Sequence, residues 1–293
     1  MNRLELFLDA IPFESIAADV HTMSQAQTER VSAEKALALL NTYANESRVS
    51  LALIIEDLDI DKALLEVGAG LCFTSLFLKS EGYHITALEP ALGGFGIFEQ
   101  LKDVILKQHD QLELQVITEP AQHLNVNQHG QFDLIFSNYV MEHIPTWQDA
   151  LSAMAAVLSE QGKMIHSCPN YSIPYEPHYG TPVFRYFPNL SRRLFVSKSA
   201  DLDIWHSLNF ITCRQIKQYC RHQHLHYHFQ ESLLYKALKR IDDDPLFKQR
   251  HQGLIANLAT FIIRSGLGNI IKYIPATMAT PMIVEISKKD TGS

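Results

Sequence analysis

The feature that most constrains the fold of this chain is the stretch LLEVGAGLCF, residues 64–73. An apolar run ends there in two glycines separated by one residue, Gly68 and Gly70. This pattern is typical of a buried strand that turns sharply into a helix, because glycine lets the backbone turn tightly and lets a ligand approach it. The first turn of the helix offers free N–H groups and the positive end of a dipole. The stretch therefore predicts a nucleotide-binding loop in an α/β fold.

Two residues of the stretch argue against a dinucleotide. A dinucleotide-binding loop carries a third glycine three residues after Gly70, where this chain has Phe73. Glu66 places a carboxylate two residues before the first glycine, where it would repel pyrophosphate. A ligand that carries adenosine and positive charge but no phosphate removes both objections. S-adenosylmethionine is such a ligand, and a nicotinamide-dependent oxidoreductase is disfavoured.

A second acid supports an adenosine ligand. Glu89, in HITALEP, follows Gly68 by 21 positions and ends the next apolar run. In nucleotide-binding folds an acid at about this place binds ribose, because one carboxylate can accept hydrogen bonds from both ribose hydroxyls. The alternative is an ordinary surface acid at a strand end.

Short apolar runs alternate with helical patterns along the first part of the chain, which predicts a parallel sheet with helices on both faces. Strands are expected at 63–67, 85–88, 112–117, 132–137 and 163–167, and helices at 31–58, 71–80, 95–108 and 147–158. Residues 1–30 are expected to be irregular, and 168–209 to form a long loop with little regular structure. A helix at 212–222, a strand at 225–230, helical structure over 232–273 and a strand at 281–288 would follow.

Five motifs, LLEVGAG, ALEP, TEPAQHL, FDLIFSNYVMEHI and GKMIHSCPNY, follow one another in this order. In this the chain resembles the class I S-adenosylmethionine-dependent methyltransferases, most closely the branch with ubiquinone-biosynthesis-like and small-molecule O-methyltransferases. The likeness covers residues 63–170 and, more loosely, 281–288. It implies an α/β Rossmann-like, doubly wound seven-stranded sheet with the last strand antiparallel.

The resemblance also implies a domain organisation and a set of cofactor-binding residues. The expected parts are an N-terminal helical cap (1–62), the cofactor-binding core (63–170), a substrate-binding loop region (171–210), and a C-terminal part (211–293) with a helical lid insertion. Residues with assigned roles are Glu66, Gly68, Ala69 and Gly70 at the methionine end, Glu89 at the ribose, Pro90, Ala121 and Gln122 at the adenine, and Asn138 and Tyr139 beside the sulfonium.

Two histidines are candidate bases, because a hydroxyl acceptor must lose a proton and imidazole suits neutral pH. His143, in VMEHIP, follows the fourth strand, and His178, in YEPHYG, lies in the long loop. The alternative for His143 is a purely structural role in its loop. Aromatic and polar residues around His178 are expected to bind the acceptor, unless the segment is only a structural lid; they are Tyr171, Tyr175, Glu176, Tyr179 and Arg185.

The net charge and the cysteines indicate which class of acceptor and which cellular compartment to expect. The net charge of −7 argues against a nucleic-acid acceptor. Four scattered cysteines without a C-x-x-C pair, and a start that does not look like a signal peptide, favour the cytoplasm. The histidines of the run HQHLHYH, residues 222–228, are expected to be solvated or to lie on an edge strand, with His226 and His228 facing outward, and a metal site is disfavoured.

The sequence thus predicts a cytoplasmic methyltransferase that uses S-adenosylmethionine, releases S-adenosylhomocysteine and methylates a small-molecule or sugar acceptor at oxygen. The apolar stretch 254–275 is a poor membrane-spanning helix and favours buried or lid helices over a surface that contacts lipid. Two alternatives remain open. One is a lipid-linked or isoprenoid acceptor, and the other is a binding subunit of the same fold without activity.

Overall fold

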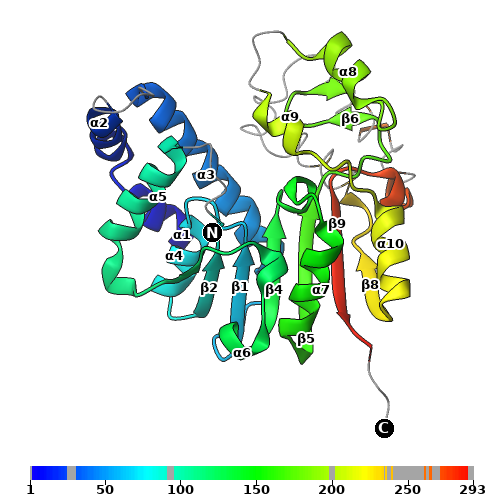
Figure 1. The fold of residues 1–293 in the computed structure, drawn as a ribbon, viewed down its shortest axis with the longest axis horizontal. Coiled ribbons are helices and arrows are strands. Elements are labelled where there is room, and N and C mark those ends of the chain that lie inside the picture. The colour runs from blue at the N-terminus through cyan, green and yellow to red at the C-terminus, as the bar shows by residue number, and fades with distance from the viewer. Residues whose placement is uncertain are drawn as a thin grey trace. The chain divides into compact units, whose positions relative to one another are not determined.

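The computed structural model describes residues 2–24, 31–90, 96–197, 202–233 and 271–289, and the single positions 235, 239, 261, 264 and 265. Its contacts divide the chain into two units (Figure 1). Unit 1 comprises residues 1–140 and 146–165, and unit 2 comprises 141–145 and 166–293. Among the described residues, no helix is long and apolar enough to cross a membrane.

A parallel sheet forms the centre of unit 1, as the alternating pattern predicts. β1 pairs in parallel with β2 on one side and with β4 on the other, and β2 pairs with β3. The strands are β1 (Ala63–Val67), β2 (His84–Leu88), β3 (Gln115–Ile117), β4 (Phe132–Asn138) and β5 (Leu158–Cys168). The connecting helices are α4 (Phe73–Ser80), α5 (Gly96–Gln108) and α7 (Trp147–Val157), with short turns at η1 (Asp110–Leu112), η2 (Ala121–His123) and α6 (Val126–His129). Since parallel crossovers are right-handed, the reversal of strand order beside β1 puts α4 and α5 on one face and α7 on the other.

The full sheet has seven strands in the order β3-β2-β1-β4-β5-β9-β8. β8 (Leu225–Phe229) and β9 (Met282–Lys288) pair antiparallel, which confirms the predicted fold class and its antiparallel last strand. Leu225 and Phe229 are buried while His226 and His228 are exposed, as the alternation in β8 predicts. α10 (Cys213–His222) precedes β8 and is capped by Thr212, whose side chain accepts a hydrogen bond from the Gln215 N–H.

The expectation that residues 1–30 are irregular was wrong. They contain α1 (Asn2–Asp9) and α2 (Phe13–Ser24), while 25–30 lie outside the described residues. Each helix buries a narrow apolar stripe, and α2 packs on α3 (Ala33–Ile54), which begins at its predicted cap Ser32. Acids between the apolar positions hid these short stripes from the sequence pattern, because only tertiary packing stabilises helices of this length.

The expectation of a long loop with little regular structure over 168–209 was also wrong. The segment holds a hairpin of β6 (Tyr175–Glu176) and β7 (Thr181–Pro182), followed by α8 (Pro188–Phe195) and α9 (Asp203–Ser207). Its elements are two to eight residues long, too short for periodicity to reveal. The helical structure predicted over 232–273, with the lid insertion, falls mostly outside the described residues, and η4 (Ala276–Met278) leads into β9.

Candidate active site

The glycine loop after β1 has a backbone that side chains would disrupt. Gly68 and Gly70 have φ of +71° and +57°. A Cβ at Gly68 would lie 2.3 Å from Val140 Cγ2, and a Cβ at Gly70 would lie 2.5 Å from Tyr43 Cε1. Cys72, the third small residue of the loop, also takes a left-handed φ of +62° and begins α4. The loop therefore leaves its backbone open to a ligand at the carboxyl end of β1, where ligands bind in open α/β sheets.

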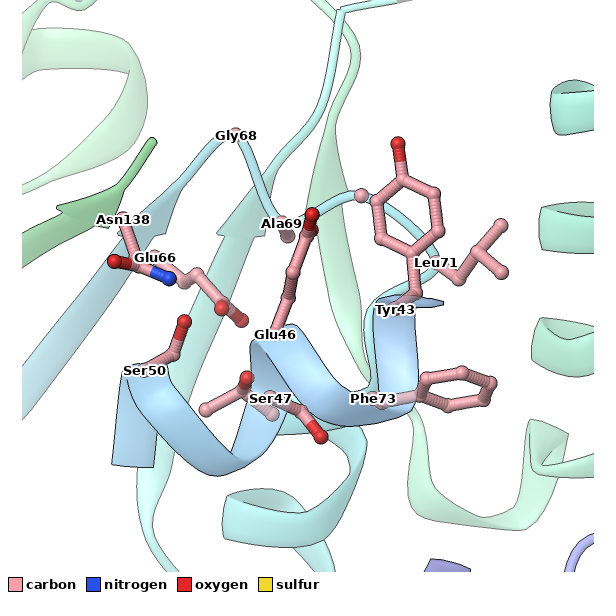
Figure 2. Close-up of a pocket in the computed structure, with 12 residues that line it drawn as sticks. Tyr43, Glu46, Ser47, Ser50, Glu66, Gly68, Ala69, Leu71, Phe73 and Asn138 are labelled. Carbon is pink, nitrogen blue, oxygen red and sulfur yellow. The ribbon is translucent and has the colours of Figure 1, made fainter. Parts of the chain in front are cut away.

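A pocket opens beside this loop within unit 1 (Figure 2). Of the predicted cofactor-binding residues, Glu66, Gly68, Ala69, Gly70 and Asn138 line it. The other lining residues are Tyr43, Glu46, Ser47, Ser50, Leu71, Phe73 and Thr74. The lining thus contains two carboxylates and no lysine or arginine, which suits a cationic ligand and disfavours a phosphate.

Glu66 is the most unusual group of the pocket. It is the fourth residue of β1, lies between Ala87 of β2 and Phe136 of β4, and is 5% exposed. Burial raises its pKa to about 7, although the Ser75 hydroxyl donates a hydrogen bond to its Oε2 at 2.5 Å. A carboxyl group whose ionised form is disfavoured by burial gains stability when a cation binds next to it.

Glu89 lies just beyond the end of β2 and contacts the same loop. Its Oε2 accepts a hydrogen bond from the backbone N–H of Gly70 at 2.7 Å. Burial raises the pKa of Glu89 to about 7, while the hydrogen bond from Gly70 and the charge of Lys102 act in the opposite direction. The predicted ribose acid thus lies against the glycine loop, as the spacing of the two motifs requires.

Asn138, the last residue of β4, offers polar atoms to the pocket. Both its side-chain Oδ1 and its Nδ2 are buried, and neither has a hydrogen-bond partner among the described residues. A buried amide without partners costs free energy, so such a group inside a pocket indicates a ligand that supplies them.

The sequence analysis missed the contribution of α3. Tyr43, Glu46, Ser47 and Ser50 of this helix face the loop and Glu66 (Figure 2). Their spacing of three or four residues puts them on one face. Ser47 and Ser50 are buried there. The sequence did contain a signal for this contribution, since two serines lie on the buried stripe of the helix. A stripe that only packs against the core would be apolar at these positions.

Five predicted cofactor residues, Glu89 and four others, do not line this pocket. Pro90 follows Glu89, and Tyr139 follows Asn138 with a left-handed φ of +55°. Ala121 is buried in η2, and the Gln122 amide donates a hydrogen bond to Thr146 Oγ1 at 3.0 Å. Their assignment to the adenine and the sulfonium stays a prediction.

Unit 2 brings one predicted base together with two predicted acceptor-binding residues. Glu176, which is fully buried, accepts hydrogen bonds from the Tyr171 hydroxyl (2.5 Å) and from the backbone N–H of His178 (2.6 Å). His178 Nδ1 also lies 2.6 Å from Glu176 Oε1. Although burial opposes ionisation of Glu176, the hydrogen bonds from His178 and Tyr171 lower its pKa. The ionised carboxylate can only accept, so Nδ1 of His178 carries a proton, and in a neutral imidazole the lone pair is then on Nε2.

His143 also belongs to unit 2. Hydrogen bonds from the side chain of Asn209 hold the backbone on both sides of it. The Asn209 side chain donates to the carbonyl oxygens of Met141 and Ile144, within the segment that contains η3 (Met141–His143). The ring of His143 lies 5.2 Å from the ring of His178, between centroids. Burial, together with the neighbouring charge of His178, lowers the pKa of His143 to about 4, although Glu176 acts in the opposite direction.

The tautomer of His143 follows from its neighbour Ser207. The Ser207 hydroxyl donates to the carbonyl of Ile204 (2.7 Å), so it accepts from His143 Nδ1, which lies 2.7 Å away. Both histidines therefore carry a proton on Nδ1, and in the neutral form of each ring Nε2 is the atom that can accept one. Together with the buried carboxylate of Glu142, they present one metal-ligating atom each within 4.8 Å of one another.

The other predicted acceptor residues do not join this cluster of Tyr171, Glu176, His178 and His143. Tyr175 is 42% exposed. The Tyr179 hydroxyl accepts a hydrogen bond from the backbone N–H of Trp205 at 3.1 Å. The Tyr179 ring packs against a small apolar core that contains Trp205. The Arg185 guanidinium stacks 5.4 Å from the ring centre of Tyr186. Their role in acceptor binding stays a prediction.

Comparison with known families agrees with the pocket chemistry. A family model described as a methyltransferase domain matches residues 32–241, well over half of the chain. The chain belongs to this methyltransferase family. It is an S-adenosylmethionine-dependent methyltransferase, as the order of its motifs predicts. The more specific likeness to a ubiquinone-biosynthesis branch stays a prediction.

The relatives of this methyltransferase do not reveal its acceptor. It is 31% identical over 258 residues to the uncharacterized protein Rv1509 of Mycobacterium tuberculosis H37Rv. This alignment covers 84% of this chain and 86% of Rv1509. The structure of YcgJ from Bacillus subtilis has a TM-score of 0.48 at 13% identity and covers 83% of this chain and 99% of its own. Phosphoethanolamine N-methyltransferase 2 of Haemonchus contortus, in complex with S-adenosyl-L-methionine, has a TM-score of 0.49 at 14% identity. The alignment covers 82% of this chain but only 52% of the Haemonchus enzyme, so this chain spans about half of that enzyme's length.

The pocket of the methyltransferase fits its cofactor. Glu66 lines the pocket and would place negative charge beside a sulfonium or an ammonium group, and Glu89, which contacts the glycine loop, would suit a pair of ribose hydroxyls. The glycine loop gives a backbone surface where Cβ atoms would collide. Asn138 adds a buried amide ready to donate and to accept. When bound, S-adenosylmethionine supplies an electrophilic methyl group.

Proposed function

We propose that this methyltransferase transfers its methyl group to a hydroxyl oxygen of a small molecule or sugar. The observation that carries this proposal is the Glu176–His178 pair. A buried, ionised carboxylate holds the imidazole by Nδ1 and leaves Nε2 free to accept a proton. A hydroxyl is a weak nucleophile until its proton is removed, so an oriented neutral imidazole is a group that O-methylation needs.

His178 is the proposed base, and His143 is the proposed partner that keeps its surroundings uncharged. The two rings meet edge to face at 66°. Because burial keeps His143 neutral at pH 7, its ring does not oppose the positive charge that His178 acquires when it takes a proton. Tyr171 belongs to the same proposal as a positioning residue, since its hydroxyl fixes Glu176 Oε2.

The same cluster supports a second form of this proposal. Glu142, His143 and His178 could bind one divalent cation, since their ligand atoms lie within 4.8 Å of one another. Metal-binding histidines are commonly held by a hydrogen bond at their other nitrogen, as both are here by Glu176 and Ser207. The cation would then lower the pKa of the acceptor hydroxyl in place of a base.

The proposed location is the cytoplasm. All four cysteines are free thiols and all are buried, which suits a reducing compartment. The net charge of −7 supports an acceptor other than nucleic acid. A binding subunit without activity is the less favoured alternative, because such a subunit would have no need for two acids and an open glycine loop.

The direct test is methyl transfer from S-adenosylmethionine labelled in its methyl group. Purified chain would be incubated with panels of phenols, free sugars, nucleotide sugars and polyprenyl-linked sugars, and with amine analogues of each. We expect label in a methyl ether of one hydroxyl class, with S-adenosylhomocysteine formed in equal amount. Methylation of amines alone would refute the oxygen acceptor, and cofactor binding without turnover on any panel would favour the silent subunit.

A further inference from the structure

α8 presents apolar side chains to solvent and turns one polar side chain, that of Ser191, toward the protein. In a surface helix the apolar stripe normally faces the core. Here Ser191 is fully buried, and its hydroxyl accepts the backbone N–H of Phe184 at 2.6 Å. Leu190 and Leu194, which lie on one flank of the helix beside Ser191, are 48% and 59% exposed. The hydrogen bond of Ser191 therefore holds the helix in an orientation that leaves this apolar flank open to solvent.

The exposed apolar residues form one patch in unit 2. Phe187, Leu190 and Leu194 follow at intervals of three and four residues and so share a helix face. Phe187 is 66% exposed and Tyr186 81%. Phe184 and Phe195 extend the surface, with ring centres 5.8 Å apart. We call these six residues the α8 patch: Phe184, Tyr186, Phe187, Leu190, Leu194 and Phe195. Within unit 2, α8 lies at the end opposite the paired strands β8 and β9 (Figure 1).

The charge around the α8 patch is opposite to that of the whole chain. Residues 177–200 contain four basic residues and no acid, in a chain whose net charge is −7. Three of the four, Arg185, Arg192 and Arg193, lie within or next to α8, and Lys198 falls outside the described residues. No described residue forms an ion pair with these three arginines. An exposed apolar face bordered by arginines is typical of helices that lie in the interface of an anionic membrane.

We propose that the α8 patch docks this methyltransferase onto a membrane surface that carries anionic lipid. Aromatic and leucine side chains would enter the boundary between head groups and acyl chains, and the arginines would meet lipid phosphates. A second copy of the chain fits less well, because a two-fold contact through this patch would bring the same arginines of both copies together. The proposal does not depend on the identity of the acceptor or on the base.

Vesicle sedimentation of the full chain tests the proposal. The probes are vesicles of phosphatidylcholine alone and of phosphatidylcholine with 30% phosphatidylglycerol. We expect at least tenfold tighter binding to the anionic vesicles at low salt, with most of the difference lost at high ionic strength. The double change Leu190→Asp and Leu194→Asp should weaken this binding at least tenfold, and Arg192→Gln with Arg193→Gln should remove the preference for phosphatidylglycerol.

The control is Leu6→Asp, which puts one such charge on an exposed leucine of α1 (66% exposed) in unit 1. It should bind vesicles as the wild type does. Cofactor affinity shows for every variant that unit 1, which holds the cofactor pocket, is intact, and the emission of the buried Trp205 checks the packing of unit 2. A variant that binds S-adenosylmethionine normally but no longer sediments with vesicles supports the proposal.

A spectroscopic probe avoids any doubt about destabilised variants. The two native tryptophans, Trp147 and Trp205, are buried, whereas position 186 is exposed. Tyr186→Trp should therefore add red-shifted emission that moves to the blue with anionic vesicles and is quenched by brominated lipid. Absence of both effects, or wild-type vesicle binding by the Leu190→Asp, Leu194→Asp variant, would overturn the proposal. A concentration-dependent dimer that this variant abolishes, without vesicle binding, would replace it with self-association.

Discussion

The carboxylate of Glu89 accepts a hydrogen bond from the backbone N–H of Gly70, 19 residues earlier in the chain, at 2.7 Å. This contact joins the two motifs that identified the cofactor in the sequence. It also closes the glycine loop against the end of β2, where the N–H groups of Gly68 and Ala69 both donate to the Leu88 carbonyl. Glu89 therefore has one observed task, the shape of the loop, and one predicted task, the binding of the cofactor.

Replacement of Glu89 should separate these two tasks. Glu89→Gln keeps an acceptor for the Gly70 N–H but removes the charge, whereas Glu89→Ala removes both. We expect Glu89→Gln to weaken S-adenosylmethionine binding by about tenfold and Glu89→Ala by more, since hydrogen bonds to charged groups contribute about 1.5–3 kcal/mol. Calorimetric titration measures both. Glu34→Gln, an exposed acid of α3, is the control and should bind normally. Equal affinity of Glu89→Ala and the wild type would contradict a cofactor role.

Gly68→Ala should abolish cofactor binding and destabilise unit 1. Its Cβ would meet Val140 Cγ2 at 2.3 Å, in a backbone with φ of +71°. Gly82→Ala is the matched control, because its φ is +90° but its Cβ would lie an ordinary 3.6 Å from Ile60. Left-handed backbone costs a non-glycine residue about 1–2 kcal/mol, so we expect a loss of this size at Gly82 and a larger one at Gly68. Denaturant unfolding measures the difference, and adding Val140→Ala should restore part of the loss at Gly68 but none at Gly82.

Most of unit 1 could be predicted because its signals are local in the sequence. β1 is found at its predicted residues, and Ser32 caps α3 as its position suggests. The contribution of Ser47 and Ser50 depends on α3 packing beside β1, a contact between distant segments that periodicity does not reveal. The contact between Glu176 and His178 depends on the tight turn between β6 and β7, and strands of two residues are too short to be predicted from the sequence. Local patterns therefore identified the cofactor, and tertiary contacts shape the rest of the site.

Glu66 should make the stability of the cofactor-free protein depend on pH. Burial raises its pKa from 4.5 to about 7, so its contribution to stability is fully present below pH 4.5 and is lost as pH rises through 7. In denaturant unfolding between pH 5 and 8, the wild type should lose roughly 2 kcal/mol more than Glu66→Gln, which cannot ionise. S-adenosylmethionine should bind the wild type more tightly at pH 8 than at pH 6, since its cationic groups favour the ionised carboxylate. A constant difference between the two proteins across this range would show that Glu66 does not titrate there.

His178→Gln should lower kcat by about a hundredfold or more once an acceptor is known, without a change in S-adenosylmethionine affinity. Glu176→Gln should lower kcat as well, because an amide cannot accept from both His178 Nδ1 and the Tyr171 hydroxyl as the carboxylate does. His226→Gln, an exposed histidine of β8, is the control. Single-turnover kinetics measure the methyl-transfer step directly. Wild-type rates in His178→Gln would refute the base and leave positioning of the acceptor as the source of catalysis.

Removal of divalent cations distinguishes the two proposed forms of acceptor activation. If His178 accepts the proton itself, enzyme dialysed against a chelator should keep its activity, because its Nε2 lone pair needs only Glu176 to orient the ring. If Glu142, His143 and His178 bind a cation, the dialysed enzyme should lose activity and regain it with one divalent metal. Cobalt absorption provides a readout apart from activity, since ligation by two imidazoles and a carboxylate would give visible bands that His143→Ala removes. Retained activity together with a featureless cobalt spectrum would assign proton transfer to the imidazole, whereas metal-dependent activity with those bands would make both histidines ligands.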